Sequence, residues 1–216
     1  VTPSATESSL NNEPTPLDGA TSTARLEQSG QPIESDSDCS AIFPLRLSDF
    51  EFYMLTDDRP SHPMVFVMVA MIRGRLHEQA FRSSLKALIK SHPLLRCCIK
   101  HLSGLGWNWV PIESGLLADD RISWMPGSDA DVKAYSPTIR PINIQEEAGF
   151  FVEAVVGPDS AQIVLHLHHC CSDGIGGLQL VGELFAHYGR QTAAPEAKRP
   201  EIDPVVPTRL LLRENY

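Results

Sequence analysis

Three histidines and two cysteines lie within six positions of the stretch HLHHCCSDGIGG, residues 166–177, and are followed by Asp173 and three glycines. Imidazole takes up and releases protons near physiological pH, and imidazole and thiolate are both ligands of zinc. Glycine lets backbone amides come close to a reacting group. The stretch is therefore a candidate general-base site, a candidate metal site, or a polar strand end without chemistry.

The surrounding pattern places this stretch on a strand, a turn and a helix. Residues 161–169, AQIVLHLHH, predict a buried strand that ends at His168 and His169, and helical spacing of apolar residues follows from residue 178. Because side chains alternate along a strand, His168 and His169 should point to opposite faces. A strand end also fixes the backbone of His169 better than a loop would.

Strands and helices alternate in the rest of the chain, which predicts an α/β or α+β domain. The first half of the chain predicts a short helix over 47–58 with Ser48 as N-cap and a strand over 63–74 in the middle of a covered sheet. A helix over 76–92 should follow, with Phe81, Leu85, Leu88 and Ile89 buried. We then expect a hairpin around Gly104 and Gly106, one short strand at 122–125 in the largely loop region 115–147, and a hairpin that ends in the histidines.

The first forty residues are acidic and contain almost no bulky apolar side chains. Seven acidic residues and one basic residue lie there, so they carry six of the nine formal net negative charges. Such a segment buries too little surface to offset its ordering entropy, and we expect residues 1–40 to be a disordered acidic tail. The remaining charges nearly balance, which argues against a nucleic-acid partner.

No signal peptide and no transmembrane segment is recognised. The longest apolar run covers residues 64–72, whereas a bilayer span needs about 20 residues. The pairs Cys97–Cys98 and Cys170–Cys171 are adjacent in sequence and lack CxxC spacing, so we expect reduced thiols that pack as small apolar groups. These features predict a cytoplasmic protein.

The residues His168, His169, Asp173 and Gly174 form a pattern of two histidines, three residues and Asp-Gly. It resembles the HHxxxDG signature of the CoA-dependent acyltransferase superfamily. Members include condensation domains of nonribosomal peptide synthetases, wax ester synthases with their diacylglycerol acyltransferase relatives, and chloramphenicol acetyltransferase. Residues 43–53, 61–66 and 74–96 are also similar to segments of this family, and the resemblance covers about residues 42–190.

This resemblance implies a chloramphenicol acetyltransferase-like lobe with a mixed sheet flanked by helices. It implies acyl transfer from a CoA or phosphopantetheine-linked thioester to a hydroxyl or amine, with no permanently bound cofactor and no metal. His169 would be the general base, His168 a structural support, and Asp173 a carboxylate that pairs with an arginine, for which Arg96 is one candidate. Gly174 would give the turn room and let helix amides approach the reacting carbonyl.

A second lobe is what the sequence lacks. Monomeric members of the family have one, yet no Asp-Phe-Gly-x-Gly or Asn-x-Pro-Gly stretch occurs here, and 43 residues follow Asp173. We therefore expect residues 41–190 to be an N-terminal lobe and residues 191–216 a linker or the start of a second lobe. The chain, which begins with Val, would be a fragment or lone lobe that is inactive without a second lobe or partner chain. A trimer like chloramphenicol acetyltransferase is the alternative.

Three other interpretations of the histidine stretch stay open. His166 and His168 share a strand face and could bind zinc together with Cys170 or Cys171, although adjacent cysteines close a tetrahedron poorly and no second ligand pair has suitable spacing. The histidines could also be structural groups at a polar strand end. Finally, the lobe could be a non-catalytic binding or docking module.

Overall fold

The computed structural model of the chain describes residues 41–112, 120–194, 196, 198 and 200–215. All of the described residues belong to one compact unit. The acidic tail expected at residues 1–40 lies outside the described residues. In chain order the elements are β1 (Leu45–Arg46), α2 (Asp49–Asp57), β2 (Val65–Arg73), α3 (Glu78–Ser91), the 3-10 helix η1 (Pro93–Arg96), β3 (Cys97–Leu102), β4 (Gly106–Pro111), β5 (Ile122–Pro126), α4 (Asp129–Ala134), β6 (Phe150–Val156), β7 (Ser160–His168), α5 (Gly174–Thr192) and the 3-10 helix η2 (Pro207–Asn215).

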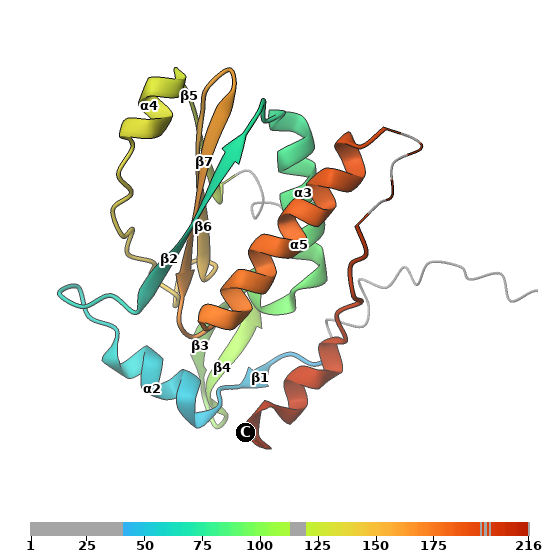
Figure 1. The fold of residues 1–216 in the computed structure, drawn as a ribbon. Helices are drawn as coiled ribbons and strands as arrows, with labels where there is room; N and C mark the ends of the chain where they lie inside the picture. Colours follow the sequence, from blue (N-terminus) through green and yellow to red (C-terminus); the bar gives the residue numbers. More distant parts are fainter. Residues whose placement is uncertain (1–40, 113–119, 195, 197, 199, 216) are drawn as a thin grey trace, which may run out of the picture. The chain divides into compact units, whose positions relative to one another are not determined.

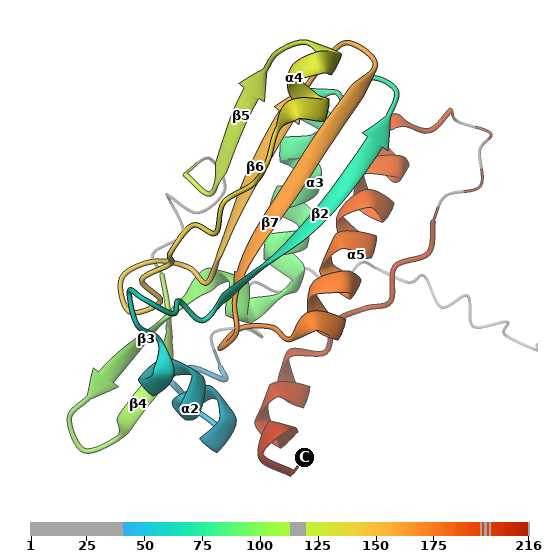
Figure 2. The ribbon, with the colours of Figure 1, turned by 60° about the vertical axis from the view of Figure 1, so that its left-hand side comes forward.

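A four-stranded mixed sheet has the strand order β2-β7-β6-β5. The pair β5 and β6 is parallel, and the other neighbouring strands are antiparallel. Helices α3 and α5 lie side by side across one face of this sheet, and α4 lies on the other face (Figure 1 and Figure 2). The predicted fold class, a mixed sheet flanked by helices, is confirmed.

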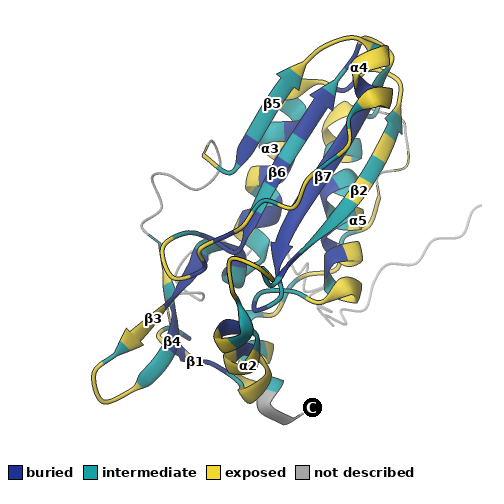
Figure 3. Cartoon of the chain, turned by 90° about the vertical axis from the view of Figure 1, so that its left-hand side faces the viewer, coloured by how far each residue is buried: buried dark blue, intermediate teal, exposed yellow. Residues whose placement is uncertain are grey.

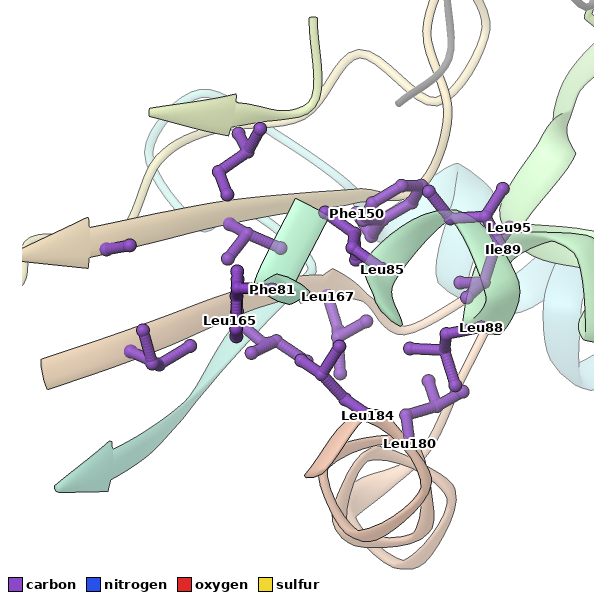
Figure 4. Close-up of a cluster of buried hydrophobic side chains, with 14 of the residues drawn as sticks. Phe81, Leu85, Leu88, Ile89, Leu95, Phe150, Leu165, Leu167, Leu180 and Leu184 are labelled. Atoms are coloured by element: carbon purple, nitrogen blue, oxygen red, sulfur yellow. The ribbon is translucent and has the colours of Figure 1, made fainter. Parts of the chain in front are cut away.

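The main core lies between this sheet and the helices α3 and α5 (Figure 4). Helix α3 contributes the predicted apolar positions Phe81, Leu85, Leu88 and Ile89, all of which are buried. Burying each of these large side chains stabilises the fold by about 1.5–3 kcal/mol. The side chains come from α3, from α5 and from the face of β7 that carries Leu165 and Leu167, so this packing fixes α5 above the end of β7.

Strand β2 is an edge strand, and the prediction of a strand in the middle of a covered sheet is wrong. Among the described strands, it pairs with β7 alone. Phe66 and Met68 pack toward the main core, whereas Val69 and Met71 lie on the opposite face and are 48% and 57% exposed. Figure 3 shows this alternation along β2 beside the buried strand β7. Apolar side chains on both faces of a strand therefore do not require that other elements of this chain cover both faces.

A second, three-stranded sheet has the order β1-β4-β3. The predicted hairpin is confirmed, since β3 and β4 are joined through Gly104 and Gly106, whose φ angles are +77° and +76°. Such angles favour glycine because it lacks a Cβ atom. The apolar cluster between this sheet and α2 contains Trp109 and also Cys170, so it reaches the histidine turn.

Helix α4 was not predicted, because residues 115–147 were interpreted as largely loop. Ser128 is its N-cap and forms a capping box with Asp131, and Val132 is fully buried. The short strand β5 in the same region was predicted. Within the described ranges, no helix combines the length and the apolar character needed to cross a membrane.

Candidate functional site

His169 follows directly after the last residue of β7. Its backbone N–H donates to the carbonyl oxygen of Met64 at 2.8 Å, which continues the pairing of β7 with the start of β2. The imidazole is half-buried and lies on the ring of Phe66, with 4.6 Å between the ring centroids and 35° between the planes. The backbone of His169 is therefore held as the sequence predicted, and part of its imidazole remains accessible.

His168 is fully buried and lies on the other face of the sheet. Its Nδ1 accepts the backbone N–H of Cys170 at 3.1 Å, and its Nε2 lies 3.5 Å from Oδ2 of Asp58. Burial lowers the pKa of His168, and the negative charge of Asp58 opposes this only in part. Because Nδ1 accepts a hydrogen bond, the neutral form of the imidazole would bear its proton on Nε2. Its position fits the expected structural support.

Asp173 is the N-cap of α5, and its carboxylate accepts the backbone N–H of Gly176 at 2.7 Å. No arginine of the described residues forms an ion pair with it, so the expected Asp173–arginine pair is absent from this part of the chain. The side chain is exposed, and capping satisfies a free helix amide without a cation. Asp173 therefore holds the turn through the helix start.

Gly174 is the first residue of α5, and its expected role beside a reacting carbonyl stays a prediction. A Cβ atom added at this position meets nothing within 4 Å, and its φ lies outside the left-handed region. Gly177, one turn further on, is the tightly packed glycine: a Cβ there would lie 3.0 Å from both Phe66 and Met68. The close approach of helix to sheet thus occurs at Gly177.

His166 has a separate set of partners from His168. Its Nδ1 accepts the backbone N–H of Arg140 at 3.3 Å, and its Nε2 lies 3.3 Å from a carboxylate oxygen of Glu153. Tyr135 donates to the same oxygen at 2.6 Å. Among the described residues, no group of three or more His, Cys, Asp and Glu side chains is placed to hold a metal ion. His166 is a structural residue beneath the segment that follows α4.

The two cysteines of the turn are poor nucleophiles. The thiol of Cys170 lies 3.4 Å from the carbonyl oxygen of Glu51, and that of Cys171 lies 3.1 Å from the carbonyl oxygen of His168. Burial raises the pKa of Cys170 far above its usual value and that of Cys171 to about 12. Both thiols are therefore protonated at neutral pH, and neither can attack an acyl group as a thiolate. Cys97 and Cys98 are also buried, as predicted.

Two residues at the site could not be identified from the sequence. Asp58 follows the last residue of α2, Asp57, and such an acidic pair resembles a solvated helix end more than a partner for a buried histidine. Arg213 of η2 lies with its Nε 3.0 Å from the buried carboxylate of Glu51, whose backbone carbonyl contacts Cys170. Residues 207–215, expected as a linker or the start of a second lobe, thus form a helix that contacts α2.

A groove of about 710 Å³ runs beside the start of α5. Asp173, Gly176 and Glu183 line one side, His92 between α3 and η1 lines another, and residues 201–206 contribute the C-terminal segment. Nε2 of His92 lies within hydrogen-bond distance of the Glu183 carboxylate, at 2.7 Å. His169 is not among the residues that line this groove.

Comparison with solved structures defines the class of fold. The chain superposes on the starter condensation domain of rhizomide synthetase with a TM-score of 0.58, 17% identity and coverage of 73% of this chain and 40% of that one. For the X-domain from teicoplanin biosynthesis the TM-score is 0.62, with 14% identity and coverage of 86% and 40%. The described residues therefore have the fold of one part of a condensation domain.

Comparison of sequences shows to which proteins the chain is similar. The chain is 28% identical over 127 residues to a phthiocerol/phthiodiolone dimycocerosyl transferase of Mycobacterium tuberculosis, and 30% identical over 128 residues to that of Mycobacterium leprae. In both comparisons 56% of this chain is covered, and the chain spans about 28% of the length of the curated relatives that it matches. No protein-family model matches the chain. Over part of its length, the chain is related to the superfamily of condensation domains and acyltransferases.

Proposed function

We propose that the chain is the N-terminal lobe of an HHxxxDG-type acyltransferase or condensation enzyme, in which His169 is the general base. The donor would be an acyl thioester of CoA or of a phosphopantetheine carrier, and the acceptor a hydroxyl or an amine. The observation that carries this proposal is the difference between the two histidines. His168 is fully buried, with Nδ1 bonded to the N–H of Cys170 and Nε2 facing Asp58 at 3.5 Å, whereas His169 is half-buried and its backbone is bonded to Met64.

The proposed chemistry needs one proton acceptor close to the reacting acyl carbon. The imidazole of His169 would take the proton of the acceptor hydroxyl or amine as that atom attacks the thioester carbonyl. When the tetrahedral intermediate collapses, the carbon–sulfur bond breaks and the leaving thiolate receives the proton from the imidazolium. The thiols of Cys170 and Cys171 would take no part, because burial keeps them protonated.

A second lobe or partner chain completes the proposed site. Ile175 and Leu178 at the start of α5 are 72% and 67% exposed, and Val69 and Met71 expose a further apolar strip on β2. Apolar surface of this kind on a globular unit marks an interaction site. The share of the curated relatives that the chain spans, about 28%, leaves ample length for a second lobe. We propose that the 216-residue chain has no acyltransferase activity alone.

Replacing His169 tests the proposal. In the complete protein that contains this lobe, His169→Ala should lower acyl transfer by about 10²- to 10⁴-fold, as expected for loss of a general base. His101→Ala is a matched control, because His101 is exposed on β3, and it should leave turnover unchanged. Equal turnover of His169→Ala and wild type would exclude the assignment. A stable complete protein without any acyl transfer would favour a docking module, and a trimer of the lone chain that releases thiol would favour the trimeric alternative.

A further inference from the structure

Asp58 closes the loop that joins α2 to β2. Its Oδ1 accepts the backbone N–H of Met64 at 2.8 Å. Inside the loop, the backbones of Arg59 and His62 are hydrogen-bonded to each other at 3.3 and 2.9 Å. Two prolines in the same loop restrict φ further. The carboxylate of Asp58 therefore fastens the end of a stiff loop at Met64.

The second oxygen of Asp58 faces His168. The distance from Oδ2 to Nε2 of His168 is 3.5 Å, which is longer than a strong hydrogen bond, so the attraction is mainly electrostatic. Nδ1 of His168 accepts the N–H of Cys170, and Nε2 must therefore carry the proton. No hydrogen-bond partner at shorter range is found for Nε2 in the described part of the chain. Asp58 thus supplies the negative charge toward which this N–H is directed.

Each residue that Asp58 contacts, Met64 and His168, is itself joined to the backbone of His169. The carbonyl of Met64 accepts the backbone N–H of His169 at 2.8 Å, and the N–H of the same Met64 is bound by Asp58. His168 precedes His169 in the chain, and Cys170, which bonds to the His168 ring, follows it. We propose that Asp58 is a positioning residue that fixes the backbone of His169 from both directions. This role rests on the proposed function, in which His169 takes the proton.

The two contacts explain why a carboxylate suits this position. One oxygen accepts the backbone N–H of Met64, and the other presents negative charge to the imidazole N–H of His168 at 3.5 Å. In Asp58→Asn one acceptor becomes an NH₂ group. If the remaining oxygen stays on Met64, a donor then faces the N–H of His168, and the imidazole must move or change its tautomer. A change of tautomer would place a proton on Nδ1 and break the bond from Cys170.

Histidine ¹⁵N spectra of the 216-residue chain test this arrangement. The wild type should show His168 as the Nε2–H tautomer, remaining neutral below the pH at which an exposed histidine is protonated. Asp58→Asn should abolish that single tautomer, shift the backbone amide signal of His169, and lower the pKa of His168 further, because the charge that favours protonation is lost. Asp57→Asn is the matched control, since Asp57 contacts only the exposed side chain of Arg59 among the described residues. It should change none of these signals.

Two results would overturn the proposal. One is an Asp58→Asn spectrum in which the signals of His168 and His169 coincide with those of the wild type. The other, which remains available if Asp58→Asn does not fold, is a wild-type spectrum with the proton of His168 on Nδ1. Asp58→Glu keeps two acceptor oxygens and should retain the Nε2–H tautomer.

Turnover of the complete protein separates this inference from the proposed function. Asp58→Asn should lower kcat by up to about 10²-fold with little change in KM, because a misplaced base affects the chemical step more than substrate binding. Asp57→Asn should leave kcat unchanged. If the wild type transfers no acyl group, the proposed function fails, while the ¹⁵N spectra still decide whether Asp58 positions His169. A normal kcat for Asp58→Asn in an active enzyme would refute the positioning role directly.

Discussion

Replacing Gly177 by alanine tests how closely α5 approaches the sheet beside His169. The added Cβ would lie 3.0 Å from Met68 Cε, 3.0 Å from Phe66 Cε2 and 3.1 Å from Leu167 Cδ1, so these side chains must move by a few tenths of an ångström. Overpacking of this kind costs about 1–3 kcal/mol. Alanine is also a better helix former than glycine by about 0.8–1.0 kcal/mol. We expect Gly177→Ala to lower the free energy of unfolding by up to about 2 kcal/mol.

Gly182→Ala, on the same helix, isolates the packing contribution. A Cβ added at Gly182 meets nothing within 4 Å, so this variant should raise the free energy of unfolding by about 1 kcal/mol. Because helix propensity cancels between the two variants, the difference between their urea-unfolding free energies measures the contact with the sheet. Phe66 also contacts the ring of His169, so the NMR signals of that ring should shift in Gly177→Ala alone. Equal stabilisation by both substitutions would refute the close packing.

Two further predictions concern the turn and the buried histidines. Asp173→Ala should lower the free energy of unfolding by about 1 kcal/mol, because the helix loses its N-cap. Asp173→Asn retains the capping oxygen and should lower that free energy by about half as much or less. Equal losses for the two variants in urea unfolding would instead indicate that Asp173 forms an ion pair. Burial lowers the pKa of His168 and of His187 in the folded chain. The unfolded chain therefore binds more protons than the folded chain below about pH 6.5. The free energy of unfolding should fall as the pH is lowered from 7.5 to 5.5. His168→Gln should reduce that loss in urea titrations at the two pH values, and stability that rises on acidification would contradict the assignment.

Local sequence signals were sufficient for several elements. The N-cap Ser48 and its capping partner Glu51 mark the start of α2, and both hydrogen bonds of the capping box are present. The spacing of Phe81, Leu85 and Leu88 marks the buried face of α3. These signals operate within one or two helical turns, so the sequence alone contains them. The alternation of His168 and His169 at the end of β7 was predictable for the same reason.

Properties that depend on distant neighbours were not predictable in this way. Whether β2 is a central or an edge strand depends on which strands pair with it, and its own residues do not contain that information. Asp58 and His168 are far apart in sequence, and only the pairing of β2 with β7 brings them together. Asp173 shows the same limit. Its carboxylate accepts a backbone amide three residues away, and the arginine partner that we expect stays a prediction.

The pairing of β2 with β7 also has a consequence for how the chain reaches its folded state. Val65 pairs with His168, and these residues are about a hundred positions apart. Closing such a long loop costs entropy before any contact compensates for it, and folding rates fall as contacts become less local. The Asp58 loop and the end of β7 come together only when these two strands pair, so helices α2, α3 and α5 can form earlier without producing the site. A refolding experiment should therefore detect helical signal before the backbone of His169 is bonded to Met64 and its imidazole packs on Phe66.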